Sequence, residues 1–180
     1  SLLLDTVLTP LLDDANTAGP AAFLLAEATM EQDASVAYSY ALLASAAAQP
    51  GSVSLMDKLE ARMTTQAVMA LQDSSAGEIG TVPTLANITT NDPRELRRVA
   101  LALFTGEGQQ RNYKQAYYFA LLAEGAGDIA ATSLREEIEG RFQGRGDAVA
   151  TLWRDTARDV QETALTDWIA NDLPARYLTN

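Results

Sequence analysis

The chain has 180 residues, with 24 acidic against 13 basic side chains for a net charge of −11, and it lacks both histidine and cysteine. These absences exclude disulfide frameworks, thiolate nucleophiles, imidazole bases and metal sites built from His or Cys. The acidic balance also argues against a nucleic-acid partner, because binding to phosphate backbones requires a basic face.

The composition is that of one globular domain spanning residues 1–180, since 47% of the residues are hydrophobic and 21% charged. No run approaches the roughly 18 apolar residues that a membrane span needs, so we expect no membrane insertion. The start of the chain has no basic region and is not a signal peptide as it stands, although one removed earlier would leave no trace. The compartment stays open between periplasm and cytoplasm, with a slight preference for the periplasm in a bacterial protein without cysteine.

The first half of the chain predicts consecutive helices. Apolar residues recur at helical spacing from about residue 20 to 28, and again over 36–47 and 55–63, and a further helix is expected from Gln66. In the 36–47 segment one apolar stripe contains Val36, Tyr40 and Leu43, while Tyr38 and Leu42 make the opposite side apolar as well. We therefore expect this helix to be covered on most faces.

Residues 74–91 lack a clear period and predict a linker. A helix start follows it, because Asp92, Pro93 and Glu95 are an N-cap acceptor, a first-turn proline and a capping-box glutamate in order. Gly106 and Gly108 predict a corner after this helix, and further helices are expected from about Asn112, residue 129 and Asp147. A C-terminal helix is expected over about 161–174, with Pro174 as its stop.

An internal repeat organises these elements. Residues 37–63 align without a gap to residues 116–142, giving 11 identities in 27 positions. Tyr38 matches Tyr117 and Glu60 matches Glu139, which a bias toward alanine and leucine alone would hardly produce. The chain is thus predicted to contain two duplicated units, at about 20–73 and 95–160.

The second copy resembles the Sel-one-like repeat family, relatives of the tetratricopeptide repeat. Residues 95–142 carry the resemblance best, and residues 20–63 carry it less well. The glycine corner and the two ends of the following helix match the family pattern at Gly106, Gly108, Tyr113, Lys114, Ala116, Ala123 and Gly127. The resemblance implies an all-α fold, a short right-handed α-solenoid of antiparallel helix pairs that binds other proteins on its concave face.

The most basic stretch of the chain lies in one predicted helical turn at Arg94, Arg97 and Arg98. Such a cluster would bind an acidic segment of a partner protein. The alternative is ordinary ion pairing with Asp92, Glu95 and Glu107.

Tyrosines supply a second set of candidate contacts. Tyr38 and Tyr117 are equivalent in the repeat, which favours packing between helices. Tyr113 and Tyr118 have no aromatic counterpart in the first copy, so they are predicted as surface contacts of the partner-binding site.

These observations favour a non-catalytic protein-interaction module without metal or cofactor. The C-terminal helix is predicted either to cap the fold or to form a homodimer. The competing hypothesis is a hydrolase that uses Asp and Glu side chains, for which Asp13, Asp14 and Glu136–Glu139 are the available acids. A solvated helix face explains those acids better, because no catalytic motif accompanies them.

Overall fold

The computed structural model describes residues 6–80 and 82–178, and within them the chain is all-α, with helices and no strand. Contacts between Cα atoms divide the chain into two compact units. The first extends to Val82 and also includes Thr105–Asn112, and the second comprises Pro83–Phe104 and the chain from Tyr113 onward. The segment 105–112, predicted as a corner of the second copy, therefore belongs to the first unit.

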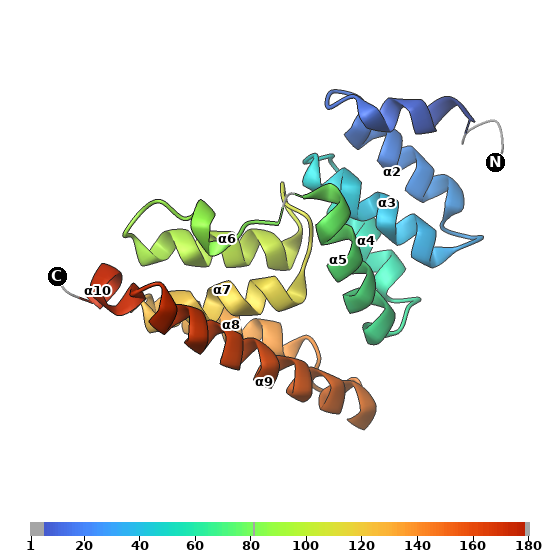
Figure 1. The fold of residues 1–180 in the computed structure, drawn as a ribbon. Helices are drawn as coiled ribbons and strands as arrows, with labels where there is room; N and C mark the ends of the chain where they lie inside the picture. Colours follow the sequence, from blue (N-terminus) through green and yellow to red (C-terminus); the bar gives the residue numbers. More distant parts are fainter. Residues whose placement is uncertain (1–5, 81, 179–180) are drawn as a thin grey trace. The chain divides into compact units, whose positions relative to one another are not determined.

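The first unit is built around α3 (Ala34–Ala46), which packs against α2 (Ala18–Thr29), α4 (Ser52–Glu60) and α5 (Thr65–Ile79) (Figure 1). A short 3-10 helix, η1 (Thr9–Asp13), precedes them and contacts α2. The starts of α3 and α5 are capped by Asp33 and Thr64, whose side chains accept backbone N–H bonds in the first turn.

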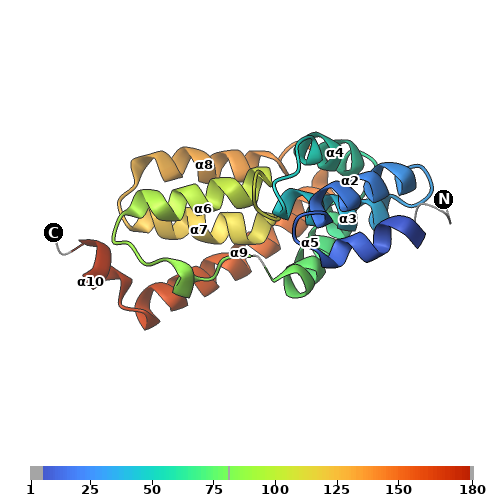
Figure 2. The same ribbon diagram turned by 90° about the horizontal axis from the view of Figure 1, so that it is seen from above.

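The second unit repeats this plan around α7 (Tyr113–Gly125), which packs against α8 (Ile129–Gly140) and α9 (Asp147–Ala170). It also contains η2 (Leu85–Asn87), α6 (Pro93–Thr105) and α10 (Leu173–Leu178). Figure 1 and Figure 2 both show α6 beside α7, with α9 following α7 along its length. Asp92 caps α6 as predicted, since its Oδ1 accepts the Arg94 N–H at 3.0 Å.

Each central helix buries one side against its neighbours. Tyr38 and Tyr117 are fully buried, which confirms their prediction as packing residues. The stripe predicted on Val36 and Leu43 is the less covered side of α3, because Val36 is exposed and Leu43 is half-buried. The core side of α3 instead carries Tyr38 and its helical neighbours Ala37, Ala41, Leu42, Ala44 and Ser45.

Two predicted boundaries are wrong. The predicted linker 74–91 is helical as far as Ile79, because Gln72 and Ser75 are buried on the inner side of α5. The predicted C-terminal helix 161–174 is the second half of α9, which runs without a break to Ala170. Pro174 does not stop this helix. It lies in the first turn of α10, where backbone N–H groups have no partner within the helix and a proline is therefore tolerated.

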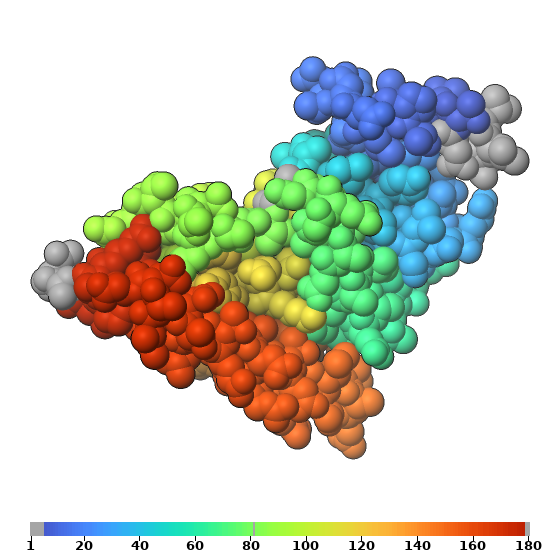
Figure 3. Space-filling view, in the orientation of Figure 1, coloured from blue at the N-terminus to red at the C-terminus, as the bar shows by residue number. Residues whose placement is uncertain are grey.

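A short C-terminal helix closes one end of the second unit. Arg176 on α10 donates to the carbonyl oxygens of Ile88 and Thr90 at 2.7 Å each. Tyr177 stacks on Trp168 with ring centroids 6.4 Å apart. The arginine thus joins α10 to the segment before α6, and the stacked rings hold α10 beside α9. Together α9 and α10 form a continuous outer surface of this unit (Figure 3).

Candidate functional site

The predicted arginine cluster is neutralised within its own unit. Arg94 pairs with Asp92 at 2.9 Å, Arg98 with Glu95 at 2.6 Å and Arg97 with Asp128 at 2.7 Å. Hydrogen bonds from these arginines lower the pKa of Asp92 and of Glu95 below their ordinary values. The third carboxylate is Asp128 of the α7–α8 connection rather than the predicted Glu107. An acidic partner would have to displace these carboxylates, and binding at the cluster stays a prediction.

The two tyrosines predicted as surface contacts are buried, so that prediction is wrong. Tyr113 packs between the rings of Phe104 and Phe142, with centroids 6.0 and 5.4 Å away, and is covered by the guanidinium of Arg141. Tyr118 points toward α9, where its hydroxyl donates to Asp167 at 2.6 Å. Burial and this hydrogen bond raise the pKa of Tyr118 well above its ordinary value. Both rings are internal packing groups of the second unit.

A polar network lies at the centre of the first unit. The hydroxyl of Tyr38 on α3 donates to Glu60 on α4 at 2.7 Å and accepts from Gln72 on α5 at 2.9 Å. Arg111 donates to the same Glu60 oxygen at 2.8 Å and to Asp57 at 2.8 Å. The side chains of Arg111 and Glu60 are only 4% and 3% exposed. Arg111 and Glu60 therefore form a buried ion pair, and the Tyr38 hydroxyl links this pair to α3 and α5.

The second unit contains the equivalent network. The hydroxyl of Tyr117 on α7 donates to Glu139 on α8 at 2.8 Å and accepts from Gln161 on α9 at 2.8 Å. The tyrosine and the glutamate are 22 residues apart in both units. The duplication read from the sequence therefore preserves a hydrogen-bonded triad of glutamine, tyrosine and glutamate that joins three helices.

Burial distinguishes the two networks. In the first unit, residues 109–112 cover the triad: Gln110 and Asn112 donate to the Gln72 carbonyl at 3.0 and 3.4 Å, and Ser45 donates to the Gln109 carbonyl. In the second unit, Gln161 is exposed and Glu139 is half-buried. There the arginine on Glu139 is Arg135 of α8 itself, at 2.8 Å. The first triad is thus covered by a loop, whereas in the second only the tyrosine is fully buried and its glutamine and glutamate partners reach solvent.

The loop over the first triad depends on a glycine. Gly106 has a φ of +76°, a left-handed conformation that side chains rarely adopt. A Cβ at this position would lie 2.7 Å from Met56 Cε and 3.1 Å from Arg111 Cβ. The glycine predicted as a simple corner therefore also permits close approach of the loop to α4.

Two grooves open on either side of Gln161 in the second unit. The polar groove has a volume of about 370 Å³ and is lined by Tyr117, Glu139, Gln161, Phe142, Gln143, Ala150, Trp153, Arg154, Ala157 and Arg158. The apolar groove has a volume of about 330 Å³ and is lined by Gln161, Leu121, Leu122, Gly125, Ala164, Leu165, Trp168 and Leu178. Because both contain Gln161, we describe them together as the open face.

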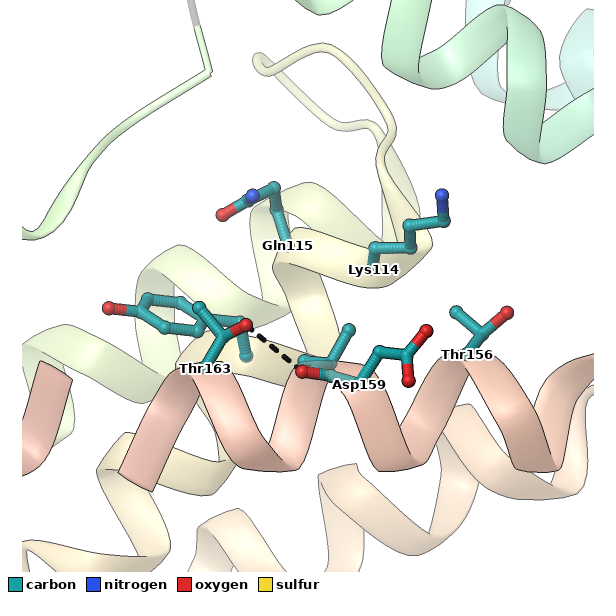
Figure 4. Close-up of a pocket in the computed structure, with 7 residues that line it drawn as sticks. Lys114, Gln115, Thr156, Asp159 and Thr163 are labelled. Carbon is teal, nitrogen blue, oxygen red and sulfur yellow. Dashed lines mark hydrogen bonds between the residues drawn. The ribbon is translucent and has the colours of Figure 1, made fainter. Parts of the chain in front are cut away.

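A smaller groove of about 220 Å³ lies along the other edge of the α7–α9 contact (Figure 4). Lys114 and Gln115 on α7 stand opposite Thr156, Asp159 and Thr163 on α9. The Thr163 hydroxyl donates to the backbone carbonyl of Asp159 at 2.9 Å, so its hydrogen bond is made within α9. The polar side chains that line this groove are scattered and do not converge on a common point.

The stability of the protein at alkaline pH provides a test of the hydrogen bonding of Tyr117 in the second triad. Burial first, and the bond to Glu139 second, raise the pKa of Tyr117 to about 12. An unfolded tyrosine ionises near pH 10, so between about pH 10 and 12 the folded state keeps a proton that the unfolded state has lost. This contribution to stability is complete below pH 10 and is lost as the pH rises through the folded-state value.

We therefore expect the free energy of unfolding to fall above about pH 10, and to fall less steeply in Tyr117→Phe. Urea denaturation at several pH values measures both slopes. Tyr40→Phe, at a half-buried position outside the triad, is the control because it removes a hydroxyl without changing the bonds to Glu139 and Gln161. Identical slopes in Tyr117→Phe and the wild type would contradict the assignment.

Within residues 6–80 and 82–178, no three Asp or Glu side chains lie together in a way that would hold a metal ion. Over the same described residues, no helix combines the length and apolar character needed to cross a bilayer. Comparison of the chain with protein-family models, with curated proteins and with solved structures found no significant match. The candidate site therefore rests on the geometry of the second unit, where an open copy of a buried triad lies between two grooves.

Proposed function

We propose that this chain is a non-catalytic protein-interaction module whose open face binds a segment of a partner protein. Its resemblance to the Sel-one-like repeat family, in which α-solenoids bind proteins, supports this proposal. The observation that carries it is the exposure of Gln161 and the partial exposure of Glu139, the two partners of the buried Tyr117, whose equivalents in the first unit are buried under a polypeptide loop.

The apolar half of the open face supports the same proposal. Leu165 on α9 and Leu178 on α10, which line this groove, are 62% and 56% exposed. Trp168 is half-buried beside them, and tryptophan in a partly covered groove is a frequent centre of binding energy. Exposed apolar residues that adjoin a groove mark interaction surfaces more often than isolated ones do. The partner is expected to place apolar side chains here and polar groups over Gln161.

A charge introduced into the apolar groove should abolish binding. Peptides selected from a display library on the wild-type protein are expected to lose at least tenfold in affinity for Leu165→Glu, because their apolar groups would face a carboxylate. Ile129→Glu is the matched control, since Ile129 is 88% exposed at the start of α8 and lies outside both grooves.

Titration calorimetry of both variants, with circular dichroism to verify folding, provides the measurement. Equal affinities for wild type and Leu165→Glu would contradict the proposal. A second copy of this chain is another occupant that the C-terminal helices would accept. Sedimentation analysis separates that outcome, because a dimer lost in Leu165→Glu would identify α9 and α10 as the homodimer contact.

A further inference from the structure

We infer that the polar half of the open face binds an arginine-bearing loop of a partner protein, in the way that the first unit binds its own residues 109–112. This inference rests on the proposed function and specifies the chemistry of the partner segment. It follows from the two equivalent triads, one of which is occupied in the structure.

The occupied copy shows what the loop supplies. Arg111 spans two carboxylates one helical turn apart on α4, with 2.8 Å to Asp57 and 2.8 Å to Glu60. Its Nη2 also donates to the Thr105 carbonyl at 2.7 Å, which fixes the guanidinium within its own loop. The amide side chains on either side of it bond the backbone of α5. The recognised features are therefore one guanidinium flanked by amide groups.

The open copy presents the same acceptors. In the alignment of the two copies Asp57 corresponds to Glu136 and Glu60 to Glu139, and Gln161 occupies the place of Gln72 on the third helix. The side chain of Glu136 is 66% exposed, and its nearest cation is Arg135, at 4.0 Å. An arginine that approaches this turn of α8 from the groove thus meets Glu139 in the groove lining and Glu136 beside it, three positions apart in the chain as Asp57 and Glu60 are.

Arg135 explains how the open triad is stable without a loop. It occupies the position of Met56 in the alignment and donates to Glu139 at 2.8 Å and to Glu124 at 2.7 Å. One arginine is then surrounded by three acids (Glu124, Glu136 and Glu139), which leaves an excess of negative charge for an incoming guanidinium. Arg154 and Arg158 also line the polar groove, and Arg158 is paired with Asp155 at 3.4 Å.

The test uses the full chain and a capped peptide with the sequence of residues 105–112. The equivalent site in the first unit is already filled, so the peptide should bind saturably to the second unit, with NMR shift changes at Tyr117, Glu139 and Gln161. Glu136→Gln is expected to weaken binding about tenfold, because it removes one of the two carboxylates. Glu137→Gln removes the same charge from the adjacent, exposed position and should stay within about twofold of wild type.

Two further peptides make the outcome decisive. Replacing the arginine of the peptide by glutamine should abolish detectable binding. Equal binding of that peptide, no binding of the arginine peptide, or equal effects of Glu136→Gln and Glu137→Gln would overturn the inference. Tighter binding of a peptide with glutamate in place of the arginine would also overturn it and assign the groove to Arg154 and Arg158. In any of these cases, display-selected peptides that still depend on Leu165 would leave the proposed function standing.

Discussion

Arg111→Met should destabilise the first unit by about 3–5 kcal/mol. The substitution keeps much of the volume of the side chain but leaves the Glu60 carboxylate, whose side chain is 3% exposed, without its guanidinium. Burying a charge without its counterion costs far more than the intact pair contributes. The Thr105 carbonyl, which accepts two bonds from Arg111, loses those donors as well.

The second unit provides the matched comparison. Arg135→Met removes the arginine from the equivalent glutamate, but the side chains of Arg135 and Glu139 are 22% and 24% exposed. Water can solvate the remaining carboxylate there, so we expect a loss of about 1 kcal/mol. The difference between the stability losses of Arg111→Met and Arg135→Met measures how strongly the covering loop increases the cost of removing the arginine.

Both tryptophans of the chain, Trp153 and Trp168, belong to the second unit. Their fluorescence therefore reports unfolding of that unit, while circular dichroism reports all helices. In Arg111→Met, the urea transition followed by circular dichroism should begin at a lower concentration than the transition followed by fluorescence. Arg111→Lys, which retains the charge, should recover part of the lost stability. Coincident, wild-type transitions in Arg111→Met would show that the buried pair contributes little.

Helical periodicity and capping residues are sufficient to predict α2 to α9, but not α10 or the two 3-10 helices. The starts of α6, α7 and α9 lie within one residue of the predicted Asp92, Asn112 and Asp147. The end of α5 was missed because Ser74, Ser75 and Gly77 are weak helix formers, and packing of the buried Gln72 and Ser75 overrides that tendency. The end of α9 is predicted too late because Pro174 resembles a stop signal, although it lies four residues beyond Ala170.

The triad was only partly visible in the sequence. Its tyrosine and glutamate recur in one register, 79 residues apart, and were found by self-comparison. Gln72 and Gln161 are 89 residues apart, because the second copy inserts ten residues before the third helix position, so the alignment could not pair them. Arg111 lies within the predicted second copy, 95–160, whereas its contacts lie in the first unit. Such long-range pairing has no local sequence signal.

Residues that are identical in the two copies of the repeat are not always equally buried. Leu42 and Leu121 are equivalent, as are Leu43 and Leu122, yet Leu42 and Leu122 are buried while Leu43 and Leu121 are half-buried. Leu121 lines the apolar groove of the open face, which explains its exposure. An α-helical repeat predicts which residues face a neighbour, and the presence of that neighbour decides whether they are covered.

An aspartate substitution is therefore expected to cause a large loss of stability at Leu122 but not at Leu43. The sequence repeat alone predicts that aspartate at either position unfolds the protein. The structure indicates otherwise: Leu122→Asp places a carboxylate at a position that is 2% exposed, whereas Leu43→Asp leaves it within reach of water. We expect a loss of at least about 4 kcal/mol for Leu122→Asp, enough to unfold many domains, and of about 1–2 kcal/mol for Leu43→Asp.

Urea denaturation followed by circular dichroism measures both variants, and Leu122→Ala separates lost packing from the buried charge. The alanine variant should lose about 3 kcal/mol through the cavity alone. Further destabilisation in Leu122→Asp, reversed in part at acidic pH where the aspartate is protonated, would identify the charge as the cause. Equal losses at positions 43 and 122 would instead mean that Leu43 is covered in solution as completely as Leu122.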